Sequence, residues 1–184
     1  TGDEMILFDN VKESENKVAV NVFASKDKVA KYLGCEIKDL VPKMINALEN
    51  PSEPTLVETT DHEEQEIDLT KLPILTHTEA DGGAYISSGL ITVKDEELGQ
   101  NICFHRGMIF DKNKIALRIL DRNTMEILKK NDGEVKAAYC IGCGGETLLA
   151  AAMAPPIGVN ELTIANTLKE INVVKAKTFD AILP

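Results

Sequence analysis

The chain has 184 residues, of which 43% are hydrophobic and 27% are charged, which is ordinary for a soluble globular protein. Its 20 lysines and arginines against 30 aspartates and glutamates give a formal net charge of −10, which repels nucleic acids and anionic membranes. We therefore expect neither as a partner, and no apolar run is long enough to cross a bilayer.

Four cysteines are present, and only Cys140 and Cys143 have the spacing of a motif, C-x-x-C. A structural zinc site needs a second pair, which Cys35 and Cys103 do not supply. A redox pair and ordinary buried thiols both stay open as interpretations, and the second is favoured. Together with the polar first residues, which are no signal peptide, the free thiols lead us to expect a cytoplasmic protein.

Residues 1–71 are predicted to form a small α/β segment. The expected strands are residues 5–8 and 18–23, and the expected helices are residues 26–33 and the stretch from Asp39 to the break at Asn50. Ser25 and Asp39 are typical N-cap residues, and Gly34 is a typical residue for the end of a helix.

Strands dominate after a change of character at Leu72-Pro73, so residues 72–184 are predicted to be a second, mostly antiparallel domain. The expected strands are residues 74–78, 85–93, 102–110, 115–120, 135–141, 173–177 and 181–183, and the expected helices are residues 123–130, 146–153 and 161–170. Gly89 inside a strand indicates a bulge or a close backbone approach. The glycine turn at residues 142–145 is only weakly similar to a phosphate-binding loop, and a tight crossover turn is favoured.

Asn101 and Arg106 are costly polar residues beside apolar neighbours, because a buried guanidinium needs an anion and a full set of hydrogen bonds. Residue type alone favours a structural ion pair over an anionic ligand. The two residues are five apart, so in an unbroken strand they face opposite sides. A rival interpretation places Asn101, Cys103 and His105 on one face as a metal site.

Five stretches of the chain, in this order, resemble the UbiD family of reversible decarboxylases, the 3-octaprenyl-4-hydroxybenzoate carboxy-lyases. They are residues 6–11, Leu75-Thr76-His77-x-x-x-Asp81-Gly82-Gly83-x-Tyr85-Ile86, Gly99-x-Asn101-x-x-x-x-Arg106, Ile141-Gly142 and Pro155-x-x-Gly158-Val159-x-Glu161-Leu162. The resemblance covers nearly all of the chain but less than half of a family member, so we expect a fragment. The family's catalytic glutamate pair lies beyond Pro184, so the fragment alone is expected to be inactive.

The resemblance implies a prenylated FMN cofactor, with a divalent metal, usually Mn²⁺, and K⁺ at its phosphate. It implies that Asn101 and Glu161 are metal ligands and that Arg106 is the catalytic arginine that meets the substrate carboxylate. The cofactor-binding residues that it implies are Ile102, Cys103, Phe104 and His105 beside the flavin and Met153 and Ala154 near the phosphate and K⁺. Without the resemblance, Glu161 is simply an acid in the first turn of a helix, which stabilises the helix dipole.

Arg122 stands where the family usually has a histidine metal ligand. Arginine stays protonated and cannot ligate a metal, but it can pair directly with the cofactor phosphate. We therefore count Arg122 among the cofactor-binding residues and keep Asp121 as a replacement ligand.

The expected fold is α+β: a small α/β N-terminal segment followed by a split β-barrel of the flavin-reductase type with peripheral helices. The expected function is that of the cofactor-binding part of a decarboxylase for an unsaturated or aromatic carboxylic acid, with anhydromevalonate phosphate as one candidate substrate. The expected partners are that small molecule, further copies of the chain in a homo-oligomer, and a flavin prenyltransferase that supplies the cofactor. The alternatives are an FMN-binding flavin-reductase-like module, a non-catalytic subunit of a multi-subunit carboxylase, and a plain structural domain.

Overall fold

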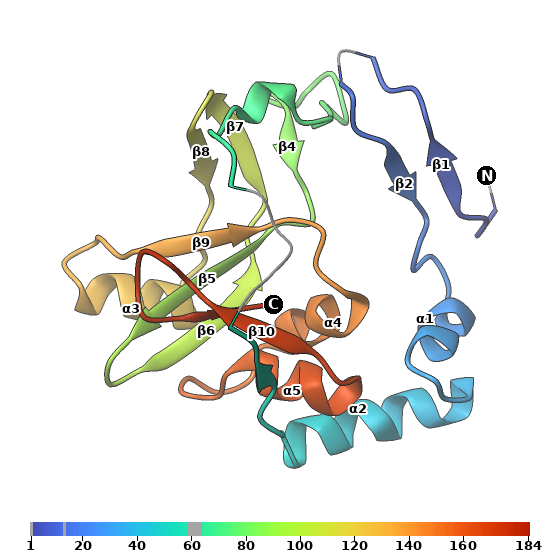
Figure 1. Ribbon diagram of the computed structural model, residues 1–184, viewed down its shortest axis with the longest axis vertical. Helices are drawn as coiled ribbons and strands as arrows, with labels where there is room; N and C mark the ends of the chain where they lie inside the picture. Colours follow the sequence, from blue (N-terminus) through green and yellow to red (C-terminus); the bar gives the residue numbers. More distant parts are fainter. Residues whose placement is uncertain (1, 13, 59–63) are drawn as a thin grey trace.

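The computed structural model describes residues 2–12, 14–58 and 64–184, and these form a mixed α/β fold with four small sheets (Figure 1). The sheets have the strand orders β1-β2, β11-β10-β3, β4-β7-β8 and β6-β5-β9. None of these four sheets closes into a barrel, so the expected split β-barrel is not confirmed. In the same residues, no helix is both long and apolar enough to span a membrane.

The N-terminal segment consists of a hairpin followed by two helices. Its elements are β1 (Ile6–Phe8), β2 (Val18–Val20), α1 (Lys26–Tyr32), η1 (Ile37–Asp39) and α2 (Leu40–Glu49). Ser25 caps α1 as predicted, since its hydroxyl accepts the backbone N–H of Lys28. Asp39 makes no such bond, because the 3₁₀ turn of η1 leads directly into α2.

The central sheet has β5 (Leu90–Asp95) in the middle, paired antiparallel with β6 (Gly99–Phe104) and β9 (Ala137–Cys140). A single strand over residues 85–93 was therefore a wrong prediction. β4 (Tyr85–Ile86) ends before Gly89 and pairs with β7 (Gly107–Asp111) in another sheet. Gly89 lies at the break because a Cβ there would run into the ring of Tyr139.

The predicted strand over residues 102–110 is also broken, at His105 and Arg106, between β6 and β7. β7 pairs with β8 (Lys114–Leu117), which confirms the predicted hairpin. The predicted strand at residues 74–78 is wrong. Instead, the Asp81 carboxylate accepts the backbone N–H groups of His77 and Thr78, both at 3.0 Å, and closes a turn.

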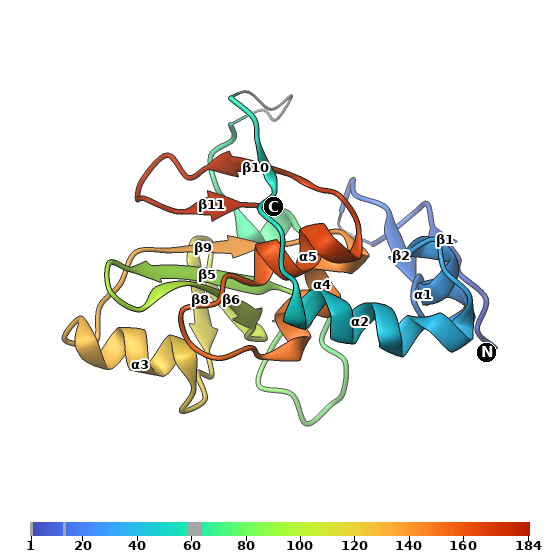
Figure 2. The same ribbon diagram turned by 90° about the horizontal axis from the view of Figure 1, so that it is seen from below.

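Three helices, a further small sheet and a 3₁₀ turn complete the described fold. They are α3 (Asn123–Lys130), α4 (Gly145–Met153), α5 (Glu161–Leu168), β10 (Asn172–Lys175), β11 (Ile182–Leu183), β3 (Thr55–Leu56) and η2 (Leu69–Lys71). α4 packs against α5 and β6, and α2 runs alongside α5 (Figure 2). β3 pairs in parallel with β10, so residues from before position 72 take part in a sheet with the C-terminal residues.

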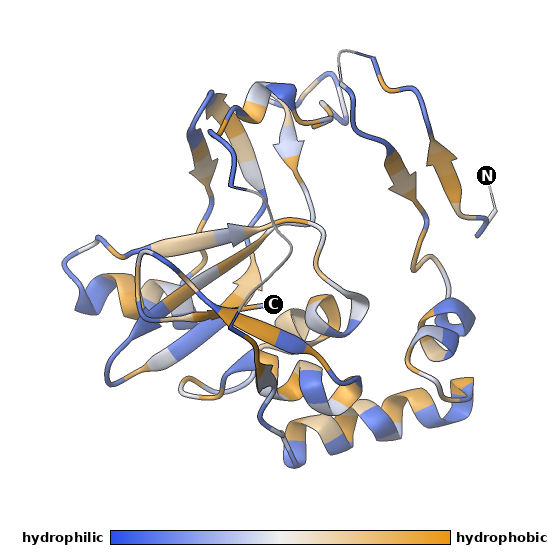
Figure 3. Cartoon of the chain, in the orientation of Figure 1, coloured by the Kyte–Doolittle hydropathy of each residue, from blue (hydrophilic) through white to orange (hydrophobic). Residues whose placement is uncertain are grey.

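The main core lies between α2, α4 and α5. Its buried members are Leu33, Leu40, Ala47, Ala150, Ile164, Ala165 and Leu168. α2 alternates apolar and polar residues along its length (Figure 3), and it buries Leu40 and Ala47 against this core. A second cluster around Leu90, Ile102 and Leu162 joins the helices to the central sheet, and it fixes the start of α5 against β6.

Candidate functional site

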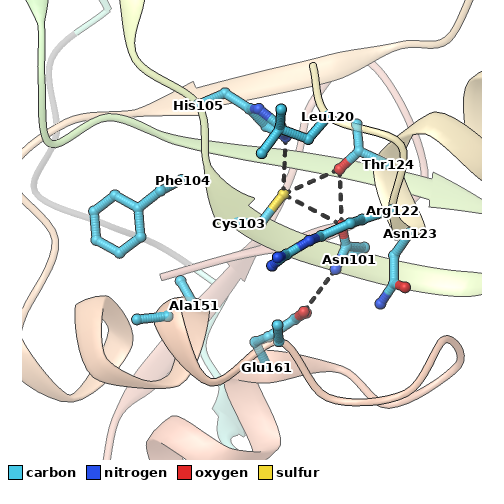
Figure 4. A pocket seen from close by; sticks show the side chains of 12 residues that line it. Asn101, Cys103, Phe104, His105, Leu120, Arg122, Asn123, Thr124, Ala151 and Glu161 are labelled. Atoms are coloured by element: carbon cyan, nitrogen blue, oxygen red, sulfur yellow. Dashed lines mark hydrogen bonds between the residues drawn. The ribbon is translucent and has the colours of Figure 1, made fainter. Parts of the chain in front are cut away.

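A pocket of about 400 Å³ opens where β6, the start of α3, the end of α4 and the start of α5 meet (Figure 4). Its size is within the range of small-molecule sites. It is lined by Asn101, Cys103, Phe104, His105, Leu120, Arg122, Asn123, Thr124, Ala151, Ala152, Ala154 and Glu161. Both predicted metal ligands and most of the predicted cofactor-binding residues therefore lie around one hollow.

Asn101 and Glu161 meet at the floor of this pocket although they are sixty residues apart in the chain. Asn101 Nδ2 donates to Glu161 Oε1 at 2.6 Å, and the backbone N–H of Ile102 donates to Glu161 Oε2 at 2.8 Å. β6 lies at the edge of its sheet, which leaves this N–H free for the carboxylate. Asn160 caps α5 by accepting the N–H of Leu162, and this cap fixes the first turn that carries Glu161.

Glu161 is almost fully buried, with 1% of the residue exposed. Burial raises its pKa to about 7, while hydrogen bonds from the backbone of Ile102, from its own N–H and from Asn101 favour the charged form. The donors from Asn101 and Ile102 are neutral groups. A buried carboxylate with neutral partners beside an open pocket is suited to binding a cation.

Cys103 lies on the same face of β6 as Asn101 and His105, as the rival metal-site interpretation required. Its sulfur is 3.4 Å from Asn101 Oδ1, 3.2 Å from His105 Nε2 and 3.0 Å from Thr124 Oγ1. Burial raises the pKa of the Cys103 thiol to about 11, so it stays protonated at neutral pH. Across the described ranges of the chain, no cluster of three His, Cys, Asp or Glu side chains is arranged to hold a metal.

His105 is held between a backbone carbonyl and a thiol. Its Nδ1 is 3.1 Å from the carbonyl oxygen of Arg118, which can only accept, so Nδ1 donates there, and Nε2 lies 3.2 Å from the Cys103 sulfur. The hydroxyl of Tyr139 donates to the carbonyl of His105 at 2.6 Å and holds the break between β6 and β7.

Arg122 is the N-cap residue of α3, and its guanidinium extends across the pocket (Figure 4). It brings a positive charge to the mouth of the pocket. Asp121, the possible replacement ligand, instead forms an exposed ion pair with Lys129 at 2.6 Å. The side chain of Asn123 donates to the carbonyl of Pro155 at 3.1 Å and ties α3 to the loop after α4.

Three predicted site residues do not line the pocket. The side chain of Ile102 points to the opposite side of β6, into the cluster with Leu90 and Leu162, and only its backbone N–H serves the site. Met153 packs against the main core, although its neighbour Ala154 lines the pocket. Arg106 is exposed in the break after β6, with its guanidinium 5.6 Å from the centre of the Tyr85 ring.

Five lining residues were not among those predicted: Leu120, Asn123, Thr124, Ala151 and Ala152. Asn123 and Thr124 begin a helix whose position was predicted. Polar residues at the start of a helix that follows a strand often face a ligand, and this pattern could have pointed to them. Cys140 and Cys143 are half-buried free thiols beside the second core cluster, outside this pocket.

Taken together, the site is a buried amide–carboxylate pair with a neighbouring arginine in a ligand-sized pocket, which is suited to a cation and an anionic group. Comparison with protein families matches residues 1–48 to the 3-octaprenyl-4-hydroxybenzoate carboxy-lyase N-terminal domain and residues 48–184 to the Rift-related domain of the same enzymes. The chain belongs to the UbiD family of carboxy-lyases.

Among similar proteins, the anhydromevalonate phosphate decarboxylase of Methanothermobacter thermautotrophicus is 32% identical over 98% of this chain and 44% of its own length. The enzyme of the same name from Methanosarcina mazei is 33% identical over 83% of the chain and 37% of its length. An evolved dimeric form of the UbiD-class enzyme HmfF from Pelotomaculum thermopropionicum, solved with prFMN, superposes with a TM-score of 0.90 at 28% identity, over 98% of this chain and 45% of that one. The chain thus spans less than half the length of these relatives.

Proposed function

We propose that this chain is the cofactor-binding part of a UbiD-like decarboxylase that uses prenylated FMN on an unsaturated or aromatic carboxylic acid. The observation that carries the proposal is the convergence of Asn101, Glu161 and Arg122 on one pocket, in a chain that belongs to this family. A structural neighbour with prFMN and relatives named as decarboxylases support it.

The donor set fits a hard divalent cation such as Mn²⁺. The side-chain oxygens of Asn101 and Glu161 are ligands of the type that Mn²⁺ prefers, and cations of this kind usually keep several waters beside one or two carboxylates. Arg122 cannot complete the set, so water and the cofactor phosphate would fill the remaining positions. K⁺ is proposed at the backbone near Ala154, which closes the α4 side of the pocket.

When bound, prenylated FMN supplies the electron sink for loss of CO₂, and the protein supplies geometry and charge. Arg122 would pair with the cofactor phosphate and offset the acidic field of the chain. Phe104 and Ala151 form the apolar side of the pocket (Figure 4), which excludes water from a flat ring. Arg106 would orient the substrate carboxylate with two parallel hydrogen bonds.

Anhydromevalonate phosphate is the proposed substrate, because two relatives that match most of this chain carry that name. A homo-oligomer and a flavin prenyltransferase that delivers the cofactor are the proposed partners. The 184-residue chain alone is proposed to bind flavin without turnover, and turnover by it would contradict the view that proton transfer needs further residues.

The test is to express the full-length protein with a flavin prenyltransferase, identify the bound flavin by mass spectrometry and assay CO₂ release from anhydromevalonate phosphate. We expect the wild-type protein to contain prenylated FMN and Mn²⁺, and we expect Glu161→Gln to lose at least 90% of the bound flavin and of the bound Mn²⁺. Glu126→Gln is the matched control, because it removes an exposed carboxylate of α3. Ordinary FMN in an inactive protein would favour the flavin-reductase-like alternative, and retention of Mn²⁺ by Glu161→Gln would contradict the proposed metal site.

A further inference from the structure

The amide of Asn101 has two different neighbours, and they determine which way it points. Its oxygen accepts the hydroxyl of Thr124 at 2.8 Å and lies 3.4 Å from the Cys103 sulfur, while its nitrogen donates to Glu161 at 2.6 Å (Figure 4). With the amide in this orientation, an N–H group faces the carboxylate. In this orientation the amide offers no ligand atom to a cation on the Glu161 side, since an N–H group is no metal ligand.

A cation shared by Asn101 and Glu161 needs the amide oxygen on the Glu161 side. A half turn about the Cβ–Cγ bond of Asn101 achieves this at low cost, because terminal torsions of this kind are broad and roughly two-fold. The turn brings the amide nitrogen against Thr124 and Cys103. Since the Asn101 side chain is buried, this N–H₂ group then needs an acceptor at that position.

Thr124 is able to serve both orientations. In the present orientation of the amide, the Thr124 hydroxyl donates to the amide oxygen. After the half turn, the hydroxyl accepts from the amide nitrogen, and its own proton points to the Cys103 sulfur 3.0 Å away. The Thr124 side chain is 2% exposed, so water does not easily take its place. Cys103 is a weaker substitute, because a thiol is a poor acceptor.

We propose that Thr124 is a positioning residue that allows Asn101 to exchange its hydrogen bond with Glu161 for a bond to a divalent cation. This inference rests on the proposed cation site and adds the residue that makes the site accessible. Thr124 is held for this role by α3, whose first turn is tied to Pro155 through Asn123 and whose C-terminal residues Lys130 and Asn131 bind Asp95.

The test is the affinity of the flavin-free, full-length protein for Mn²⁺, measured from the electron paramagnetic resonance signal of the free ion. Thr124→Val keeps the shape of the side chain but removes both donor and acceptor, and we expect Mn²⁺ to bind about 3- to 30-fold more weakly. Thr124→Ser keeps the hydroxyl and is expected to bind within about twofold of the wild type. Melting temperatures without Mn²⁺ identify variants that fold, and Thr124→Ala replaces the valine variant if that one does not.

A second background separates the role of the amide from a packing effect. Asn101→Asp presents an oxygen to both sides without turning, and it shares one proton with Glu161 until a cation replaces that proton. Thr124 therefore donates to the introduced carboxylate in both states. In the Asn101→Asp background, Thr124→Val should therefore weaken Mn²⁺ binding by less than about twofold. Equal Mn²⁺ affinity in the wild type and in folded Thr124→Val would overturn the role of Thr124 but not the cation site. The same holds if Thr124→Ser binds Mn²⁺ as weakly as Thr124→Val does. Absence of Mn²⁺ binding by the wild type would overturn the cation site and this proposal with it.

Discussion

Arg122 places a permanent positive charge at the pocket, because a guanidinium is not deprotonated in proteins. It stands at the position where the family resemblance leads one to expect a histidine metal ligand. In the proposed site, Arg122 would therefore pair with the cofactor phosphate directly, whereas a histidine at this position would act through the metal.

Replacing Arg122 with Gln should weaken FMN about 10- to 100-fold, as expected for the loss of a charge-assisted hydrogen bond. Riboflavin lacks the phosphate, so its affinity should stay within about twofold. Flavin fluorescence titration measures both. Arg118→Gln is the control, because Arg118 is exposed and does not line the pocket. Equal losses for FMN and riboflavin would mean that Arg122 supports the pocket wall rather than the phosphate.

Single residues also show how far the sequence could predict the site. Asn101 and Glu161 were expected to converge, and they lie within hydrogen-bonding distance. Arg106 could not be placed from strand periodicity, because the strand is interrupted at the residue itself. Thr124 was missed because its importance depends on how α3 packs on β6, and no short sequence pattern contains that packing.

Among the elements, helices were predicted better than strands, because the hydrogen bonds that begin a helix join residues close together in the sequence. Ser25, the predicted N-cap of α1, forms a hydrogen bond to a residue only three positions away, so the sequence around it was enough. The strand breaks at Gly89 and at His105 depend on Tyr139, whose ring leaves no room for a Cβ at Gly89 and whose hydroxyl donates to the carbonyl of His105. Such contacts between distant residues are invisible to a pattern of alternation.

The turn between β5 and β6 is linked to α3 through Asp95. Its carboxylate accepts from Lys130 at 2.8 Å and from the side chain of Asn131 at 3.0 Å, and it also accepts two backbone N–H groups of the turn. These bonds, of which that to Lys130 has the largest effect on the pKa, hold the pKa of Asp95 well below its usual range. The turn therefore helps to keep Thr124 beside Asn101.

The lowered pKa of Asp95 predicts how stability depends on pH. The carboxylate contributes its full stability above the pKa of an unfolded aspartate, about 4, and loses it as pH falls toward the lower folded pKa. Asp95→Asn should therefore lower the urea midpoint at pH 7, and the gap to the wild type should narrow below about pH 4. Asp180→Asn is the control, since Asp180 is an exposed partner of Lys94. A gap that is constant from pH 7 to pH 3 would contradict this account.

At the scale of the whole molecule, the two matched family domains meet at a partly buried polar contact. The hydroxyl of Tyr32, from α1, donates to the carboxylate of Glu146 at 2.5 Å, and it accepts the backbone N–H of Gly145 at 3.3 Å. Phe23 packs edge-on against the Tyr32 ring, and the ammonium of Lys169 lies 3.9 Å from the ring centre. Gly145 permits this approach, since a Cβ there would collide with both rings.

Removing the Tyr32 hydroxyl tests whether this contact joins the two domains. Glu146 is 6% exposed, so Tyr32→Phe leaves a buried carboxylate with only the long 3.5 Å bond from the Thr147 hydroxyl, and we expect a loss of about 1–3 kcal/mol in the free energy of unfolding. Hydrogen exchange should become faster in α1 than in β5, because the contact holds the N-terminal helix onto the start of α4. Tyr85→Phe is the matched control, because Tyr85 meets Arg106 through its ring. If exchange rises equally in α1 and β5, the two domains unfold as one unit and the contact is no separate joint.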